Sequence, residues 1–158
     1  GVKLVVSDGH KGIQKAVTES FIGSSWQMCH VHLIRQVLKK VPKKKQKEVS
    51  EKIKEALVDR QKLQDLIREL DNMGYKSAAD TLEHFQYDVM NYMQFPQNHW
   101  RRIRTTNMME RTNKEIKRRS KVVGAFPNKE SVLRLVVSIL IDINEEWITG
   151  NTYIVMEQ

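Results

Sequence analysis

The pattern of apolar and polar positions changes character along the chain. Residues Val2 to Ser7 are almost all apolar and end at an Asp-Gly pair, which predicts a strand that is buried on both faces and followed by a turn. A second short strand is predicted from Trp26 to Cys29. After each strand, apolar residues recur every three or four positions, which is the spacing of an amphipathic helix. The chain therefore begins as β-α-β-α.

From about residue 46 to residue 92, the strands give way to three amphipathic stripes, each of which predicts a helix. The third stripe runs from Ala78 to Tyr92. Beyond a Phe-Pro break, a polar and basic helix is predicted from Asn107 to about Lys121. A last long helix follows Asn128, a good N-cap residue, and its many apolar side chains predict a core helix. The predicted fold class is α/β, mostly helical.

Composition narrows the class of protein further. Apolar residues make up 40% of the chain, which is enough for a folded core. The longest apolar run is interrupted by Arg134 and Asp142 and falls short of the ~20 residues of a membrane span, so no membrane contact and a cytoplasmic location are expected. Cys29 is the single cysteine, which rules out an internal disulfide. Because Gly1 precedes a strand with no earlier partner strand, we expect a piece of a longer protein.

The net charge of +8 is concentrated in two zones. Arg35 to Lys47 carries seven basic residues and no acidic one, and Arg101 to Lys121 carries nine basic residues against Glu110 and Glu115. Such zones indicate contact with a polyanion such as nucleic acid. The first zone is equally well interpreted as a solvated loop between helices, because blocks of like charge often stay hydrated. The predicted DNA-binding residues, all in the second zone, are Arg101, Arg102, Arg104, Arg111, Lys114, Lys117, Arg118 and Arg119.

Two carboxylates stand at positions that suit phosphoryl transfer. Asp8 ends the first strand, and Glu110 lies on the basic helix. Asn107 and Asn113 share the helix face of Glu110 at three-residue spacing. A two-metal centre needs carboxylates that converge from rigid elements, whatever their separation along the chain. Each residue also has a simpler interpretation: Asp8 as a turn residue, and Glu110 as the partner of Asn107 in a capping box. The residues alone leave these interpretations open.

Three potential metal ligands, Cys29, His30 and His32, are close together in the sequence. A structural zinc site normally needs four ligands in paired spacings, and no second Cys/His pair follows. We therefore favour a different arrangement over zinc. Cys29 is predicted to end the second strand, and His32, on the first turn of the next helix, is predicted to point toward the space near Asp8. There the imidazole would orient a carboxylate or a phosphate.

Several long motifs, in order, resemble one known family. They are SDGHKGI, WQMCHVHLIRQVLKKVPKK, FPQNHWRRIRTTNMMERTNKEIKRRSKVVGAFPN and the LRLV segment that follows. Together they resemble the C-terminal part of Mutator-type transposases of bacterial insertion sequences, from about residue 3 to residue 150. The resemblance implies a partial RNase H-like core, with two strands present, interrupted by an all-α insertion domain. The implied parts are 1–41 (core), 42–100 (helical insertion) and 101–158 (core, with the glutamate-bearing helix).

The resemblance also assigns roles to residues. Asp8 falls on the second aspartate of an Asp-Asp-Glu triad and Glu110 on the glutamate, whereas Cys29 and His32 fall on the family's Cys-x-x-His signature. Asn107 and Asn113 are expected to support the site. The first aspartate has no counterpart in the sequence, so residues 1–158 alone are expected to be inactive.

The activity implied by the resemblance is metal-dependent DNA cleavage and strand transfer of an insertion sequence. The implied cofactor is Mg²⁺ (or Mn²⁺), with two ions in the complete enzyme, bound in part by Asp8 and Glu110. The implied partners are DNA, both transposon ends and target, and further copies of the chain. The alternative is a non-catalytic helical module for nucleic-acid binding or assembly, in which Asp8 is a turn residue and Glu110 a helix cap.

Overall fold

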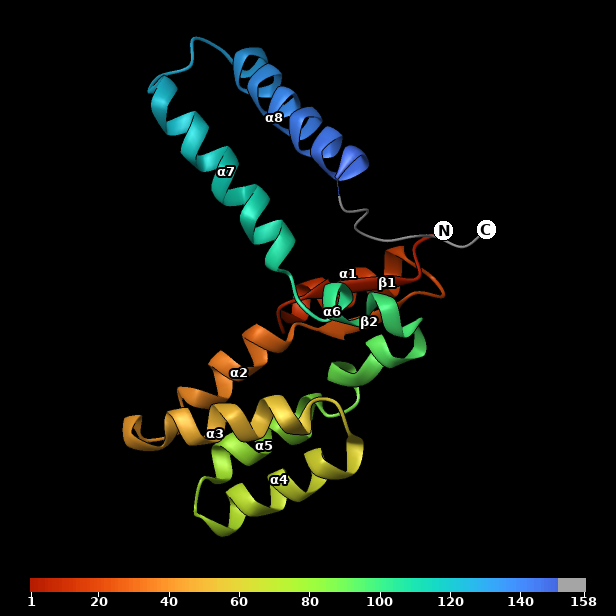
Figure 1. Ribbon diagram of the computed structural model, residues 1–158, viewed down its shortest axis with the longest axis vertical. Helices are drawn as coiled ribbons and strands as arrows, with labels where there is room; N and C mark the ends of the chain where they lie inside the picture. Colours follow the sequence, from red (N-terminus) through yellow and green to blue (C-terminus); the bar gives the residue numbers. More distant parts are fainter. Residues whose placement is uncertain (151–158) are drawn as a thin grey trace. The chain divides into compact units, whose positions relative to one another are not determined.

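A computed structural model describes residues 1–150 of the chain and shows a mostly helical protein with two parallel strands (Figure 1). The described residues form two compact units, which divide after Thr106. The first unit holds both strands and the helices up to residue 106, and the second holds two long helices. The mostly helical α/β class is confirmed. The division into parts 1–41, 42–100 and 101–158 stays a prediction.

The two predicted strands form a small parallel sheet. Strand β1 (Leu4–Ser7) pairs with β2 (Ser25–Met28), with Leu4 opposite Ser25 and Ser7 opposite Met28. Helix α1 (Lys11–Ser20) connects them, as a parallel pair requires. At its N-terminus the His10 imidazole accepts a hydrogen bond from the Gly12 N–H, so this helix is capped by a histidine.

Four helices build most of the core of the first unit, and Figure 1 shows three of them, α3 to α5, lying together. They are α2 (His30–Leu38), α3 (Lys43–Ala56), α4 (Arg60–Asn72) and α5 (Lys76–Phe85). The predicted amphipathic stripes are their buried faces. The Asp59 carboxylate caps α4 by accepting hydrogen bonds from the N–H groups of Gln61 and Lys62. Fully buried members of this core include Leu33, Val37, Ile53, Leu63, Leu70 and Leu82.

The third amphipathic stripe is not one continuous helix. α5 ends at Phe85, and the chain resumes as a 3₁₀ helix, η1 (Asp88–Gln94). The buried Gln27 amide of β2 donates to the Val89 carbonyl at 2.8 Å and accepts from the Tyr92 N–H at 2.7 Å. These bonds hold η1 against β2 by satisfying backbone groups that an α-helix would pair internally. A stripe read from local spacing cannot show a partner 62 residues away.

A second 3₁₀ helix, η2 (Gln97–His99), and the short α6 (Trp100–Ile103) complete the first unit. The indole N–H of Trp100 donates to the Phe95 carbonyl at 2.7 Å, and the ring packs edge-on against Tyr92 at a centroid distance of 5.3 Å. Trp100 is therefore a packing anchor of this segment.

The second unit is a pair of helices, α7 (Asn107–Val123) and α8 (Lys129–Thr149). Asn128 caps α8 as predicted, accepting a hydrogen bond from the Ser131 N–H at 2.9 Å. The expectation that α8 is a core helix is wrong for the described residues, because Leu133 and Ile148 remain 61% and 70% exposed and only Ile139 of this helix is buried. The facing α7 is polar, so it offers little apolar surface to cover them. Within residues 1–150, no helix combines the length and apolar character needed to cross a membrane.

Candidate active site

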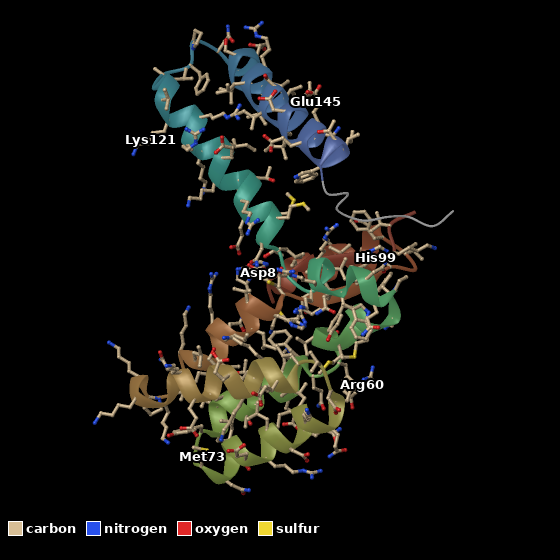
Figure 2. The ribbon with its side chains drawn as sticks, in the orientation of Figure 1. Asp8, Arg60, Met73, His99, Lys121 and Glu145 are labelled. Atoms are coloured by element: carbon tan, nitrogen blue, oxygen red, sulfur yellow. The ribbon has the colours of Figure 1, made fainter. Side chains whose placement is uncertain are left out.

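Asp8 directly follows β1 and is held by its neighbours (Figure 2). One carboxylate oxygen, Oδ1, accepts a hydrogen bond from the His10 N–H at 3.2 Å. The Ser7 hydroxyl donates to the Asp8 carbonyl at 2.8 Å and accepts from the Trp26 indole N–H of β2, also at 2.8 Å. The half-buried carboxylate therefore stands on a turn that both strands fix in place.

An open cavity of about 730 Å³ lies beside this turn. The turn supplies Asp8, Gly9 and His10 to its lining. Helix α2 supplies side chains spaced three or four residues apart, so one helix face is turned to the cavity. His32 belongs to this face and lines the same cavity as Asp8, while its predicted role there stays a prediction. The other lining residues of the 30–46 segment are Arg35, Gln36, Leu38, Lys39 and Gln46.

Gly9 allows the turn to pack closely on the helical block. A Cβ at this position would lie 2.8 Å from the Phe85 ring and 3.5 Å from the Gln36 side-chain nitrogen. The first distance is well inside van der Waals contact, so a larger residue would force the Phe85 ring or the turn to shift. The Asp-Gly pair is thus required by packing as well as by turn chemistry.

Cys29 is fully buried and fastens the segment that leads into α7. Its sulfur accepts a hydrogen bond from the Thr106 N–H at 3.4 Å, and its own N–H donates to the Ser7 carbonyl at 2.8 Å. The next residue, His30, donates its N–H to the Arg104 carbonyl at 3.0 Å. The Cys-x-x-His pair therefore has two different surroundings, with the cysteine in packed backbone and His32 in the cavity lining.

The zinc alternative does not fit this geometry. The Nε2 atom of His30 lies 2.9 Å from the Val89 carbonyl, which requires that nitrogen to carry a proton. Burial lowers the pKa of the His30 imidazole to about 4, so the ring is neutral near pH 7. Cys29 therefore contacts Thr106 and His30 contacts Val89, whereas His32 lines the cavity. In the part of the chain that the structure describes, no three His, Cys, Asp or Glu side chains gather as a metal site.

Glu110 lies in the first turn of α7 and is exposed, as are Asn107 and Asn113. The predicted helix and its polar face are thus present. The capping-box interpretation of Asn107 and Glu110 stays a prediction, and so does their role beside a metal.

Some predicted DNA-binding residues are engaged in ion pairs. Glu115 accepts two hydrogen bonds from Arg118 and one from Arg119, and these hold the pKa of its carboxyl at about 2. Arg119 also reaches Asp142 of α8 at 2.9 Å and so joins the two helices. Arg111, Lys114 and Lys117 are exposed.

In the first unit, Arg101 is exposed, whereas Arg102 and Arg104 are half-buried. Burial lowers the pKa of the His30 imidazole, and the nearby Arg104 guanidinium lowers it further. Burial raises the pKa of the Tyr92 hydroxyl, and Arg104 partly offsets that rise, so Arg104 lies against the core. Three cavity-lining residues, Arg35, Gln36 and Lys39, are not among the site residues predicted from the sequence. Their three- and four-residue spacing from His32 was the available signal.

Comparison with known proteins places the chain among transposases. Residues 1–150 match the family described as Transposase, Mutator family. The chain is 36% identical over 155 residues to the transposase for insertion sequence element IS256 in transposon Tn4001 of Staphylococcus aureus, covering 94% of this chain and 40% of that protein. It is 34% identical over 163 residues to the transposase for insertion sequence element ISRM5 of Rhizobium meliloti, covering 99% and 41%. The chain thus spans about two fifths of the length of these relatives and belongs to the Mutator family of transposases.

Proposed function

We propose that this chain supplies the second aspartate and the glutamate of an Asp-Asp-Glu transposase. The proposed activity is metal-dependent DNA cleavage and strand transfer of an insertion sequence. The observation that carries the proposal is the position of Asp8, a carboxylate fixed at the end of a parallel strand and lining an open cavity. Family membership supplies the substrate class, because relatives are named as transposases of insertion sequences.

The donor set fits a hard divalent cation. Mg²⁺ and Mn²⁺ favour oxygen ligands and tolerate sites in which water completes the coordination. The Asp8 carboxylate offers such oxygens, whereas the Cys29 sulfur is turned into packed backbone. We assign Asp8 and Glu110 as two of three carboxylates that hold two ions. The first aspartate of the triad has no counterpart in residues 1–158, so these residues are expected to be inactive alone.

When bound, the ions would activate first water and then a DNA 3′-hydroxyl, and would stabilise charge on the attacked phosphate. Asp8 and Glu110 would hold them, and no covalent bond to the protein would form. His32 lines the same cavity as Asp8, where it would orient a phosphate or the Asp8 carboxylate itself. Asn107 and Asn113 would support Glu110 on its helix face. Cys29 would position the chain entering α7 through Thr106.

The remaining parts of the proposal concern partners and architecture. The two strands and their helices are assigned to an RNase H-like core, and residues 42–100 to a helical insertion within it. The proposed partners are the DNA of transposon ends and target, with further copies of the chain in the active assembly. The exposed cations Arg101, Arg111, Lys114 and Lys117 are proposed to contact phosphates directly. Arg118 would do so only by exchanging its Glu115 partner, and Arg119 only by exchanging both Glu115 and Asp142.

Glu110 gives the test of this proposal. In the natural protein that contains this sequence, Glu110→Gln is expected to lower strand transfer about a thousandfold, because a metal's stabilisation of the reacting phosphate is worth several kcal/mol. Binding to transposon-end DNA should remain, since the side chain keeps its shape. Glu145→Gln, on the exposed surface of α8 (Figure 2), is the matched control and should leave transfer unchanged. Normal transfer by Glu110→Gln would favour the helix-cap interpretation and a non-catalytic module.

A further inference from the structure

One face of α2 presents positive charge to the Asp8 cavity. His32, Arg35 and Lys39 line the cavity at positions i, i+3 and i+7. The opposite face is fully buried through Leu33 and Val37. Because a helix rises 1.5 Å per residue, the Arg35 and Lys39 positions are separated by about 6 Å along the axis. The lining of the cavity therefore contains one carboxylate, from Asp8, and two cations spaced along α2 and its C-terminal end.

The positive charge continues onto α3. Lys43, Lys44 and Lys47 are exposed in the first turns of that helix, and no ion pair is found for them within residues 1–150. The corner between the helices is fixed by Gln46, whose amide donates to the Leu38 carbonyl at 2.8 Å and the Val41 carbonyl at 3.1 Å. We call Arg35, Lys39, Lys43, Lys44 and Lys47 the α2–α3 basic strip.

Neighbouring lysines of the same block are already occupied. Lys45 pairs with Glu48 at 2.8 Å, and Lys54 pairs with Glu51 at 2.7 Å. Lys40 donates to the Ser77 carbonyl and the Thr81 hydroxyl of α5. These lysines are engaged by neighbouring groups, whereas no ion pair is found for the members of the strip within residues 1–150. The position of Arg35 and Lys39 in the cavity lining distinguishes the strip from an ordinary solvated helix face.

We propose that the α2–α3 basic strip binds the phosphodiester backbone of DNA that enters the Asp8 cavity. This inference rests on the proposed function, which supplies DNA as the substrate. The spacing fits, because about 6 Å of helix corresponds to about two nucleotides at 3.4 Å each along one strand. From residue 23 to residue 57 no large apolar side chain is exposed, so the strip lacks the apolar residues that insertion into a membrane surface would use.

Each phosphate contact releases counterions, so loss of contacts changes the salt dependence of binding. Arg35→Gln/Lys39→Gln, in the natural protein that contains this sequence, should reduce the slope of log K against log[KCl] by about two for duplex DNA. Affinity at about 0.1 M salt should fall by about tenfold to a hundredfold. Fluorescence anisotropy between about 50 and 200 mM KCl measures both quantities.

The matched control is Arg60→Gln/Lys62→Gln, which removes two exposed cations from the start of α4, away from Asp8 (Figure 2). It should leave the slope unchanged. An unchanged slope in Arg35→Gln/Lys39→Gln, or an equal change in this variant and in the control, would refute DNA binding by the α2–α3 basic strip.

Lys43→Gln/Lys47→Gln provides a second variant if the first is poorly folded, with the same expected change in slope. If the strip variants leave the salt dependence of DNA binding unchanged while Glu110→Gln abolishes strand transfer, the proposed function stands without the strip. If the strip variants change the salt dependence while Glu110→Gln keeps full strand transfer, the strip is the DNA-binding surface of a non-catalytic module.

Discussion

Replacement of Asp8 by asparagine is expected to lower strand transfer by about a thousandfold or more, with little change in folding. A bound metal supplies several kcal/mol of stabilisation to the reacting phosphate, and each 1.4 kcal/mol corresponds to about tenfold in rate. Asparagine retains the oxygen that accepts the His10 N–H, so the turn keeps its hydrogen bond. It lacks the negative charge that would hold a divalent cation. Strand transfer in the natural protein that contains this sequence measures the loss.

Asp80→Asn is the matched control, because Asp80 is exposed on α5 and outside the cavity lining. Transfer and thermal stability of this variant should equal those of the unmodified protein. If Asp8→Asn and Asp80→Asn behaved alike, Asp8 would be a turn residue. A large drop in the thermal stability of Asp8→Asn would likewise move its role from chemistry to folding.

The second large effect is on stability and concerns Gln27. Gln27→Leu should lower the free energy of unfolding by about 2–4 kcal/mol, because the three hydrogen bonds of the side-chain amide are lost. One of these three is the bond that satisfies the buried Tyr92 N–H. The Val89 carbonyl keeps its bond from His30, which limits the cost. Urea unfolding of residues 1–158 followed by circular dichroism measures the change.

Gln64→Leu on the exposed face of α4 serves as the comparison and should change the free energy of unfolding by less than about 0.5 kcal/mol. An equally small effect of Gln27→Leu would mean that the bridge between β2 and η1 contributes nothing. η1 would then be held by the packing of Val89 and Met90 alone.

Local periodicity predicted most of the elements of this chain. The strands at residues 4–7 and 25–28, the helices up to Phe85 and α8 follow from apolar spacing, whereas α7 follows from its polar and basic pattern after the Phe-Pro break. Periodicity failed where a distant side chain decides the backbone. The stripe from Ala78 to Tyr92 breaks because Gln27 takes up backbone groups of η1. Periodicity also wrongly predicted that α8 is a core helix, because an apolar stripe indicates a face suited to burial but does not show whether another element covers it.

The candidate site was predicted in part. The sequence predicts that His32 lies on the first turn of the helix after the second strand and points toward the space near Asp8, and both residues line the same cavity. The partners of the arginines do not follow from sequence, since Arg119 reaches Asp142 across 23 residues. The buried contact between Cys29 and Thr106, 77 residues apart, is of the same kind. Such pairings depend on how the elements pack in space, which the separation of the two residues along the chain does not indicate.

Metal binding by Asp8 can be tested by changing the ligand atom. Asp8→Cys replaces a hard oxygen with a softer thiolate, which Mg²⁺ accepts poorly and Mn²⁺ accepts better. The measurement is the ratio of strand transfer in Mn²⁺ to that in Mg²⁺, for the variant and for the unmodified natural protein. We predict that the variant is inactive in Mg²⁺ and partly restored in Mn²⁺, which raises the ratio at least about tenfold. An unchanged ratio, with activity in Mg²⁺ retained, would contradict metal binding by Asp8.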